Sequence, residues 1–190
     1  SLDLIDKTAA LDHYYQLQVR FKTADAMGAN FINSCLESLA DELEKVSQQD
    51  ASFTEDNPKI EVIMSILSNY VPECLVHAKV SCPIDSIEPQ EGMDGATFAK
   101  KIVQAIQIAN CEPYRAVTHN KGIMNGVDAL VLATGNDFRA IEAGVHAYAA
   151  RSGNYSSLSQ ASIVNNQFSM ELTLPLAIGT VGGLTKLHPM

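Results

Sequence analysis

The stretch that decides the fold class is residues 15–47, YQLQVRFKTADAMGANFINSCLESLADELEKVS. Apolar and polar side chains alternate along its first seven residues, from Tyr15 to Phe21, which is the period of a half-buried strand. Helical spacing follows and predicts an amphipathic helix over residues 25–47, with apolar positions at Ile32, Cys35, Leu36, Leu39, Leu43 and Val46. A strand followed by a long helix indicates a chain that mixes both kinds of element.

The next segments extend this pattern. After the polar loop QQDASFTEDNPK, residues 60–67 form an apolar run typical of a strand. A further strand is expected beyond Pro72, with one face made by Val76, Ala78, Val80 and Cys82. Apolar residues recur at helical spacing over residues 98–109, and Asp94 is placed to cap that helix. The order strand, helix, strand, strand, helix predicts an α+β fold with most of a split βαβ, or ferredoxin-like, unit.

The composition changes beyond Glu112. Residues 129–133 are predicted to be a short apolar strand, and residues 137–151 an alanine-rich helix. A serine-rich turn then leads to a strand in which Phe168, Met170, Leu172 and Leu174 alternate with polar residues. The chain finishes on the glycine-rich GTVGGLTKLHPM, which we expect to be an interrupted domain.

Composition excludes several classes of protein. The chain has 190 residues, of which 46% are hydrophobic and 18% charged, as in a globular protein with a sizeable core. A net charge of −9 disfavours nucleic acid or an anionic membrane surface as the main partner. The four cysteines show no CxxC spacing, so reduced, buried thiols are favoured over a zinc site or disulfides. No apolar run has transmembrane length, and we expect a cytoplasmic location.

The motif DAMGAN, residues 25–30, lies between the first predicted strand and helix. A helix N-terminus presents unpaired N–H groups to a phosphate or polar ligand edge, and Gly28 would permit close approach of the backbone. In the alternative interpretation, Asp25 simply caps the helix and Gly28 eases packing. The chain has no GxGxxG after a strand and no P-loop, so a Rossmann site is unsupported.

A second motif, HNKGIMNG at residues 119–126, surrounds Lys121 with amides and glycines. We expect a loop here, in which Lys121 and Arg115 grip a carboxylate and polarise a carbonyl. Asp137 stands at the start of the next predicted helix, where its carboxylate could pair with Lys121. His119, Asn120 and Asn125 could hold such groups without adding charge. Alternatively, Lys121 is solvated, Asp137 is an N-cap and Arg115 forms a surface ion pair. The residues alone leave both interpretations open.

Together these motifs resemble a known family. DAMGAN, YRAVTHNKGIMNG, LVLATGNDFRAIEAGVHAYAARSGNYSSL and LPLAIGTVGGLTKLHP occur in the order found in hydroxymethylglutaryl-CoA (HMG-CoA) reductases of the bacterial-type class II. The resemblance begins near Leu17. It implies reduction of HMG-CoA to mevalonate and CoA, or the reverse, by hydride transfer with NAD(H) or NADP(H) and no metal. It also implies a cytoplasmic, dimer-based homo-oligomer without nucleic-acid or membrane partners.

The resemblance also implies roles for individual residues. Lys121 would be the catalytic lysine that stabilises the oxyanion, and Asp137 the catalytic aspartate that interacts with it. Asn125 would orient this network, and Arg115 would hold the substrate's carboxylate. The cofactor-binding positions would be Asp25, Met27, Gly28, Asn30, Gly182 and Gly183. Leu184 departs from the small residue usual in that glycine turn. The family's catalytic glutamate and histidine match nothing in this chain, and His188 belongs to another motif, so we expect an inactive fragment.

The predicted domains follow from the same resemblance. Residues 1–12 would lead in from the larger domain, and residues 13–110 would form the ferredoxin-like, NAD(P)-binding small domain. Residues 111–190 would belong to the larger α/β domain that binds substrate. One alternative is a non-catalytic ferredoxin-like binding or regulatory module with affinity for a dinucleotide or acyl-CoA. Separation of Lys121 from Asp137 in space would favour it. A weaker alternative is a structural oligomerisation domain.

Overall fold

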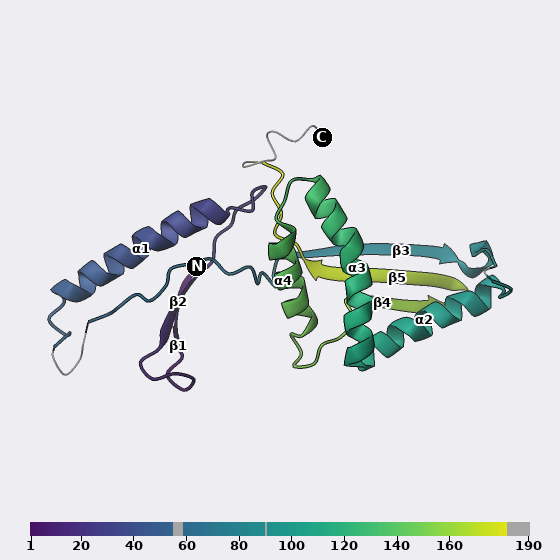
Figure 1. Cartoon of the computed structure of the whole chain (residues 1–190), viewed down its shortest axis with the longest axis horizontal. Helices are drawn as coiled ribbons and strands as arrows, with labels where there is room; N and C mark the ends of the chain where they lie inside the picture. The colour runs from purple at the N-terminus through teal and green to yellow at the C-terminus, as the bar shows by residue number, and fades with distance from the viewer. Residues whose placement is uncertain (55–58, 90, 182–190) are drawn as a thin grey trace. The chain divides into compact units, whose positions relative to one another are not determined.

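The computed structural model describes residues 1–54, 59–89 and 91–181. Gly182 and Gly183, two of the predicted cofactor-binding residues, therefore lie outside the described residues, as does Leu184. The chain forms two compact units, residues 1–67 and residues 68–190 (Figure 1). Each unit is described by itself.

The first unit contains a β-hairpin and a long helix. Strands β1 (Leu2–Asp6) and β2 (Tyr15–Val19) pair antiparallel, and helix α1 spans Ala29–Gln49. The predicted strand after Tyr15 and the predicted amphipathic helix are thus both present. Strand β1 falls in the segment that we expected to be a lead-in. Its pairing with β2 is reinforced at the hairpin's open end, where the Arg20 guanidinium meets the Asp3 carboxylate at 2.8 Å.

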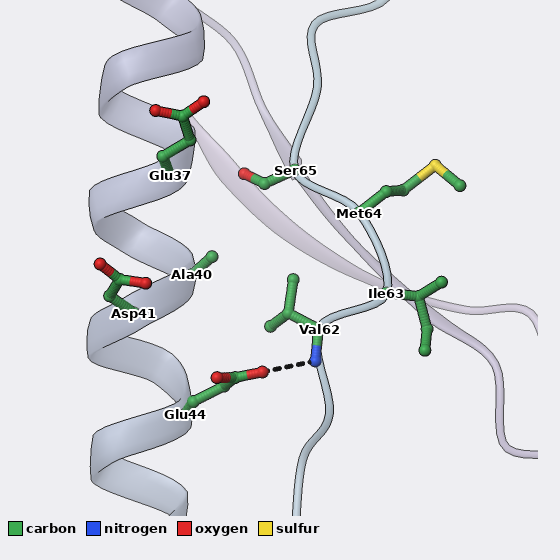
Figure 2. Close-up of a pocket in the computed structure, with 8 residues that line it drawn as sticks. All are labelled: Glu37, Ala40, Asp41, Glu44, Val62, Ile63, Met64 and Ser65. Atoms are coloured by element: carbon green, nitrogen blue, oxygen red, sulfur yellow. Dashed lines mark hydrogen bonds between the residues drawn. The ribbon is translucent and has the colours of Figure 1, made fainter.

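The strand predicted at residues 60–67 is wrong. This segment is extended but pairs with no strand among the residues that the structure describes, and it runs along α1 (Figure 2). Side chains of α1 accept hydrogen bonds from the backbone of this segment. The Val62 N–H donates to the Glu44 carboxylate at 2.8 Å, and the Leu67 N–H donates to the Asn33 side-chain carbonyl at 2.9 Å. Apolar periodicity indicates an extended chain, whereas a strand also needs a neighbour for its hydrogen bonds.

The described part of the second unit contains a three-stranded antiparallel sheet in the order β3-β5-β4, with two helices packed against the sheet and a third packed against those two (Figure 1). Its strands are β3 (Leu75–Pro83), β4 (Ser159–Val164) and β5 (Gln167–Pro175). Its helices are η1 (Ile84–Ser86), α2 (Gly95–Cys111), α3 (Pro113–Ala133) and α4 (Phe138–Ala149). Helix α2 packs against β4, and α4 packs against β5.

Several expectations for this unit are confirmed. The Asp94 carboxylate caps α2 by accepting from the Thr97 N–H at 2.8 Å, and α4 matches the predicted alanine-rich helix. The predicted apolar face of β3 pairs in register with the alternating apolar residues of β5, as in Cys82 with Phe168. Because β3 is an edge strand, this face is only partly covered, and Val80 is 64% exposed.

Residues 113–133 form one helix, so the predicted Lys121 loop and the predicted strand at residues 129–133 are both wrong. The Glu112 carboxylate caps this helix, accepting from Arg115 N–H at 2.7 Å, and proline occupies the first helical position. Met124 and Val131 are buried seven residues apart, and Leu132 is 55% exposed. Two glycines within the helix and a fully apolar final turn hid the helical period from sequence analysis.

Strand β4, which forms a hairpin with β5, was not predicted from the sequence. Two asparagines, Asn165 and Asn166, make the turn with φ of 49° and 60°. Asn tolerates this left-handed conformation better than most residues, and such turns suit a tight hairpin. The pair Asn-Asn between two alternating segments was the sequence signal that could have found it.

The core of the second unit has two clusters. The larger joins α3, α4, the following loop and β5, through Met124, Val131, Ile141, Val145, Tyr148, Ala149, Leu158 and Leu174. The smaller lies under α2 and contains Ile84, Ala99 and Phe168. All four cysteines are free thiols. Cys35 and Cys82 are half-buried, but Cys74 and Cys111 are exposed, which corrects the expectation of buried thiols.

The α+β class is confirmed. The strands that we grouped into a ferredoxin-like unit lie in different sheets, however, because β2 pairs with β1 and β3 pairs with β5. A strand's neighbour depends on tertiary packing, which the order of elements along the chain does not fix. The ferredoxin-like assignment therefore stays a prediction about the complete protein.

Candidate functional site

Lys121 and Asn125 lie on one exposed face of α3. They are four residues apart in the helix, so their side chains are neighbours on its surface. Both residues are exposed, and the Lys121 side chain makes no hydrogen bond or ion pair with any residue that the structure describes. The Lys121 ammonium and the Asn125 amide are therefore available to bind an anion or a carbonyl group of a ligand.

Asp137 is the N-cap residue of α4. One oxygen of its carboxylate accepts from the backbone N–H groups of Arg139 and Ala140, each at 3.1 Å. The preceding Asn136 N–H donates to the Val131 carbonyl at 3.0 Å, which places this turn beside the end of α3. Lys121 lies ten residues before Val131, an axial rise of about 15 Å. The structure therefore does not bring Lys121 and Asp137 together.

His119 and Asn120 serve the serine-rich loop after α4, not Lys121. Asn120 is fully buried, and its amide nitrogen donates to the Ser156 carbonyl at 2.9 Å. Its carbonyl oxygen accepts from the Leu158 N–H at 3.1 Å. His119 Nε2 lies 2.7 Å from the Ser159 hydroxyl. The expectation that these two residues hold groups around the lysine is corrected: they fix the loop that leads into β4.

Arg115 is placed on another part of α3. It lies in the first turn, four residues before His119, and is half-buried. Burial lowers the pKa of the His119 imidazole, and the positive charge of Arg115 lowers it further. Arg115 and Lys121 are six residues apart, so their side-chain directions around the helix axis differ by about 120°. The two cations that we expected to grip one carboxylate thus point from different faces of this helix.

The DAMGAN motif forms the entry to α1. The helix begins at Ala29, and its N-cap residue is Gly28, with no side-chain hydrogen bond to the first turn. The N-cap position is therefore held by Gly28 and not by Asp25. Asp25 and Asn30 are exposed, and Met27 is half-buried. The first N–H groups of α1 have no side-chain cap, and such an end favours negative charge.

Gly28 is required by the fold itself. Its φ is 78°, a left-handed conformation, and a Cβ at this position would lie 2.5 Å from Thr23 Cγ2. We expected Gly28 to permit the approach of a ligand or to ease packing. The contact with Thr23 shows that close packing of the chain already requires a glycine.

A pocket of about 350 Å³ lies elsewhere in the same unit, between α1 and residues 62–65 (Figure 2). Its walls carry three acidic side chains from α1, Glu37, Asp41 and Glu44, which disfavour an anionic ligand. In the described part of the chain, no three His, Cys, Asp or Glu side chains lie close enough to hold a metal ion. No helix among the described residues is long and apolar enough to cross a membrane.

The fold and motifs define an α+β protein with a polar helix face in one unit and an uncapped helix N-terminus in the other. The profile of hydroxymethylglutaryl-coenzyme A reductase matches residues 2–190, and the chain belongs to this family. It is 38% identical over 167 residues to the 3-hydroxy-3-methylglutaryl-coenzyme A reductase of Archaeoglobus fulgidus. A probable reductase of Borreliella burgdorferi is 38% identical over 173 residues.

These matches cover most of the chain but a minority of each relative. The two matches cover 87% and 91% of this chain. The chain in turn spans 34% and 37% of the lengths of the two relatives. Matches to solved structures show the same partial coverage. A reductase from Streptococcus pneumoniae has a TM-score of 0.73 at 42% identity, over 87% of this chain and 37% of that one. The class II reductase of the same organism bound to NADPH has a TM-score of 0.74 at 43% identity, over 88% of this chain and 43% of that one.

Proposed function

We propose that the complete protein is an NAD(P)-dependent HMG-CoA reductase, which interconverts HMG-CoA with mevalonate and CoA. The observation that carries this proposal is the family match along residues 2–190, which includes both polar motifs. The similarity to a class II reductase whose structure holds NADPH supports a nicotinamide cofactor. This chain supplies part of that enzyme, because it spans about a third of its curated relatives.

Lys121 is the proposed catalytic cation. Reduction of a thioester places negative charge on the carbonyl oxygen, and a nearby ammonium stabilises that charge most where it has no competing partner. Lys121 is exposed and unpaired among the described residues, which fits this role. Asn125, one turn away on the same face, is proposed to orient the lysine and the substrate. Arg115 is proposed to bind the substrate's free carboxylate.

Asp137 is the proposed proton-transfer partner of Lys121. The carboxylate lies at the exposed start of α4, where one of its oxygens accepts from two backbone N–H groups. Because the two side chains do not meet in this structure, the proposal assigns their pairing to the complete protein with substrate bound.

Nicotinamide cofactor binding is assigned to the entry of α1. The exposed Asp25 can accept from hydroxyl or amide groups, and the uncapped N–H groups beyond Gly28 can receive a phosphate or carboxamide oxygen. Met27 and Asn30 flank this entry. A bound nicotinamide cofactor supplies or accepts the hydride. Gly182 and Gly183, which lie outside the described residues, are also proposed to bind the cofactor.

The wider organisation is also proposed from the family. It comprises a dimer-based homo-oligomer, a cytoplasmic location and no nucleic-acid, membrane or metal partner. Residues 13–110 are proposed as the ferredoxin-like small domain, and residues 1–12 and 111–190 as parts of the larger domain. The compact units described above divide the chain at a different point, after Leu67, by contacts within this chain alone.

The test measures HMG-CoA-dependent oxidation of NADPH and of NADH by the complete protein. Lys121→Ala should lower kcat by at least about 100-fold, the usual effect of removing an oxyanion stabiliser. Lys101→Ala is the matched control, because Lys101 is an exposed lysine on the neighbouring helix α2 and has no proposed role. Turnover by Lys121→Ala equal to that of the control would refute the catalytic assignment.

One observation favours a second function. The separation of Lys121 from Asp137 suits a non-catalytic binding or regulatory module with affinity for a dinucleotide or acyl-CoA. Isothermal titration of the complete protein with NADPH and with CoA separates the two proposals. Binding without turnover in either direction would support the module, whereas turnover that depends on Lys121 supports the reductase.

A further inference from the structure

Helices α3 and α4 each carry a single acidic residue, and these two residues interact. Asp128 is the only carboxylate among the residues of α3, and Glu142 is the only one in α4. Helices α3 and α4 share the larger core cluster, and across this contact the Glu142 side chain acts on the Asp128 carboxyl through its charge and a side-chain hydrogen bond. Carboxylates only accept hydrogen bonds when ionised, so this contact is a hydrogen bond only while one of the two holds a proton.

The environment of Asp128 favours that proton. Its Oδ1 atom is inaccessible to solvent, and with both acids ionised it has no hydrogen-bond donor in reach among the described residues. A buried acceptor without a donor destabilises the fold. A proton held between Asp128 and Glu142 removes this problem, since the protonated carboxyl donates and the ionised carboxylate accepts.

The charged groups that act on Asp128 both come from α4. They are Glu142 and His146, which are four residues apart on one face of that helix. His146 Nδ1 lies 2.7 Å from the Tyr155 hydroxyl, and the two rings stack with centroids 6.0 Å apart. Burial raises the pKa of Asp128, the charge and hydrogen bond of Glu142 raise it further, and the charge of His146 opposes them.

We propose that Asp128 and Glu142 share one proton across the contact between α3 and α4, and that they act as positioning residues for Lys121. Lys121 lies seven residues before Asp128, nearly two helical turns, on the same side of α3. Loss of the shared proton sets two negative charges against each other and loosens α3 against α4. The part of this proposal that concerns Lys121 rests on the proposed function; the shared proton itself does not.

The raised pKa fixes the direction of the pH dependence. An acid whose pKa is higher in the folded than in the unfolded state contributes stability that is complete below its ordinary value of 3.8. That contribution is lost as the pH rises through the raised pKa. Asp128→Asn keeps a donor for Glu142 without a charge, so it should stabilise the protein at neutral pH and lose this advantage in acid.

The experiment follows thermal unfolding of the complete protein between about pH 4 and pH 8. The variants are Asp128→Asn, Glu142→Gln and their combination, with Glu73→Gln as the control for an exposed acid. Each single variant should raise Tm at neutral pH, and the double variant should add nothing further, because one neutral donor is sufficient. The control should follow the wild type. Should one variant fail to fold, the other tests the same pair.

Additive effects of the two single variants, or an Asp128→Asn shift that does not change with pH, would overturn the shared proton. Turnover tests the positioning role: the ratio of kcat for Asp128→Asn to that of the wild type should increase with pH. A constant ratio would overturn that role. The two proposals can fail separately. Wild-type turnover by Lys121→Ala would refute the reductase site and leave the unfolding result intact.

Discussion

Asn120 in α3 and Leu158 before β4 are joined by a hydrogen bond of 3.1 Å, in which the Leu158 N–H donates to the buried side chain. The same amide donates to the Ser156 carbonyl at 2.9 Å. One side chain thus satisfies two backbone groups of a loop 36 residues away in sequence. Asn125, one and a half turns further along α3, is exposed instead.

Asn120 and Asn125 should therefore respond differently to alanine. Asn120→Ala leaves a buried N–H and a buried carbonyl without partners and should destabilise the fold by about 2–4 kcal/mol. Asn125→Ala should leave stability within about 0.5 kcal/mol of the wild type and lower turnover instead. Denaturant unfolding and steady-state kinetics on the same two variants check both halves. Equal loss of stability in the two would contradict the assignment of Asn120.

Gly28 should not tolerate a side chain. Its φ is 78°, and an added Cβ would lie 2.5 Å from Thr23 Cγ2, so Gly28→Ala should cost more than about 1 kcal/mol. Gly92→Ala is the control because Gly92 has nearly the same φ, 79°, but no atom within 4 Å of an added Cβ. The difference in unfolding free energy between the variants measures the contact with Thr23. No difference would show that backbone conformation alone requires the glycine.

The pKa of His119 predicts a loss of stability in acid. Burial and the charge of Arg115 hold this pKa below its ordinary value of 6.5, so the folded state favours neutral imidazole. The resulting stability is complete above pH 6.5 and is lost as the pH falls through the lowered pKa. His119→Gln keeps a polar partner for Ser159 but cannot be protonated in this range, so its unfolding should depend less on pH.

His77→Asn provides the control for this titration, because His77 is an exposed residue of β3 whose ring contacts the Thr173 hydroxyl. Thermal unfolding of the wild type and both variants across the acid range supplies the comparison. If His119→Gln followed the wild type at every pH, neutral His119 would not contribute to stability.

Val131 and Leu132 test the helix that replaces the predicted strand. Val131 is 4% exposed in the larger core cluster, and Leu132 is 55% exposed on the other side of α3. Val131→Ala should lower the free energy of unfolding by about 1.5–3 kcal/mol, from lost burial and an unfilled cavity. Leu132→Ala should change it by less than about 0.5 kcal/mol. Similar losses of unfolding free energy in both variants would instead fit the strand predicted at residues 129–133, in which both side chains would be buried.

The elements that were predicted correctly are those that a local pattern of residues specifies. The alternation from Tyr15, the helical spacing of α1 and α2, and the capping positions of Asp94 and Asp137 all follow from residues close together in the chain. The family, too, was recognisable from short motifs, and the profile match confirms it.

The errors have two origins, namely apolar runs whose neighbours are unknown and glycines that disfavour a helix. Residues 60–67 and 129–133 are apolar runs of strand length, and such runs do not reveal whether a partner strand or a helical neighbour is present. In the structure, α1 side chains accept from the first run, and the second completes α3 against the α4 core. The loop predicted around Lys121 failed because glycines lower helix propensity by about 1 kcal/mol each, which packing overrides.

The sequence by itself determined the class of fold, the family and the residues that carry the proposed chemistry, because these are encoded in local periodicity and short motifs. Tertiary structure decided how those residues are used. It buries Asn120 in the core and leaves Lys121 exposed and unpaired among the described residues. It also placed Asp128 against Glu142. The orientation of each helix is set by which apolar face packing buries, and that face depends on neighbours distant in sequence.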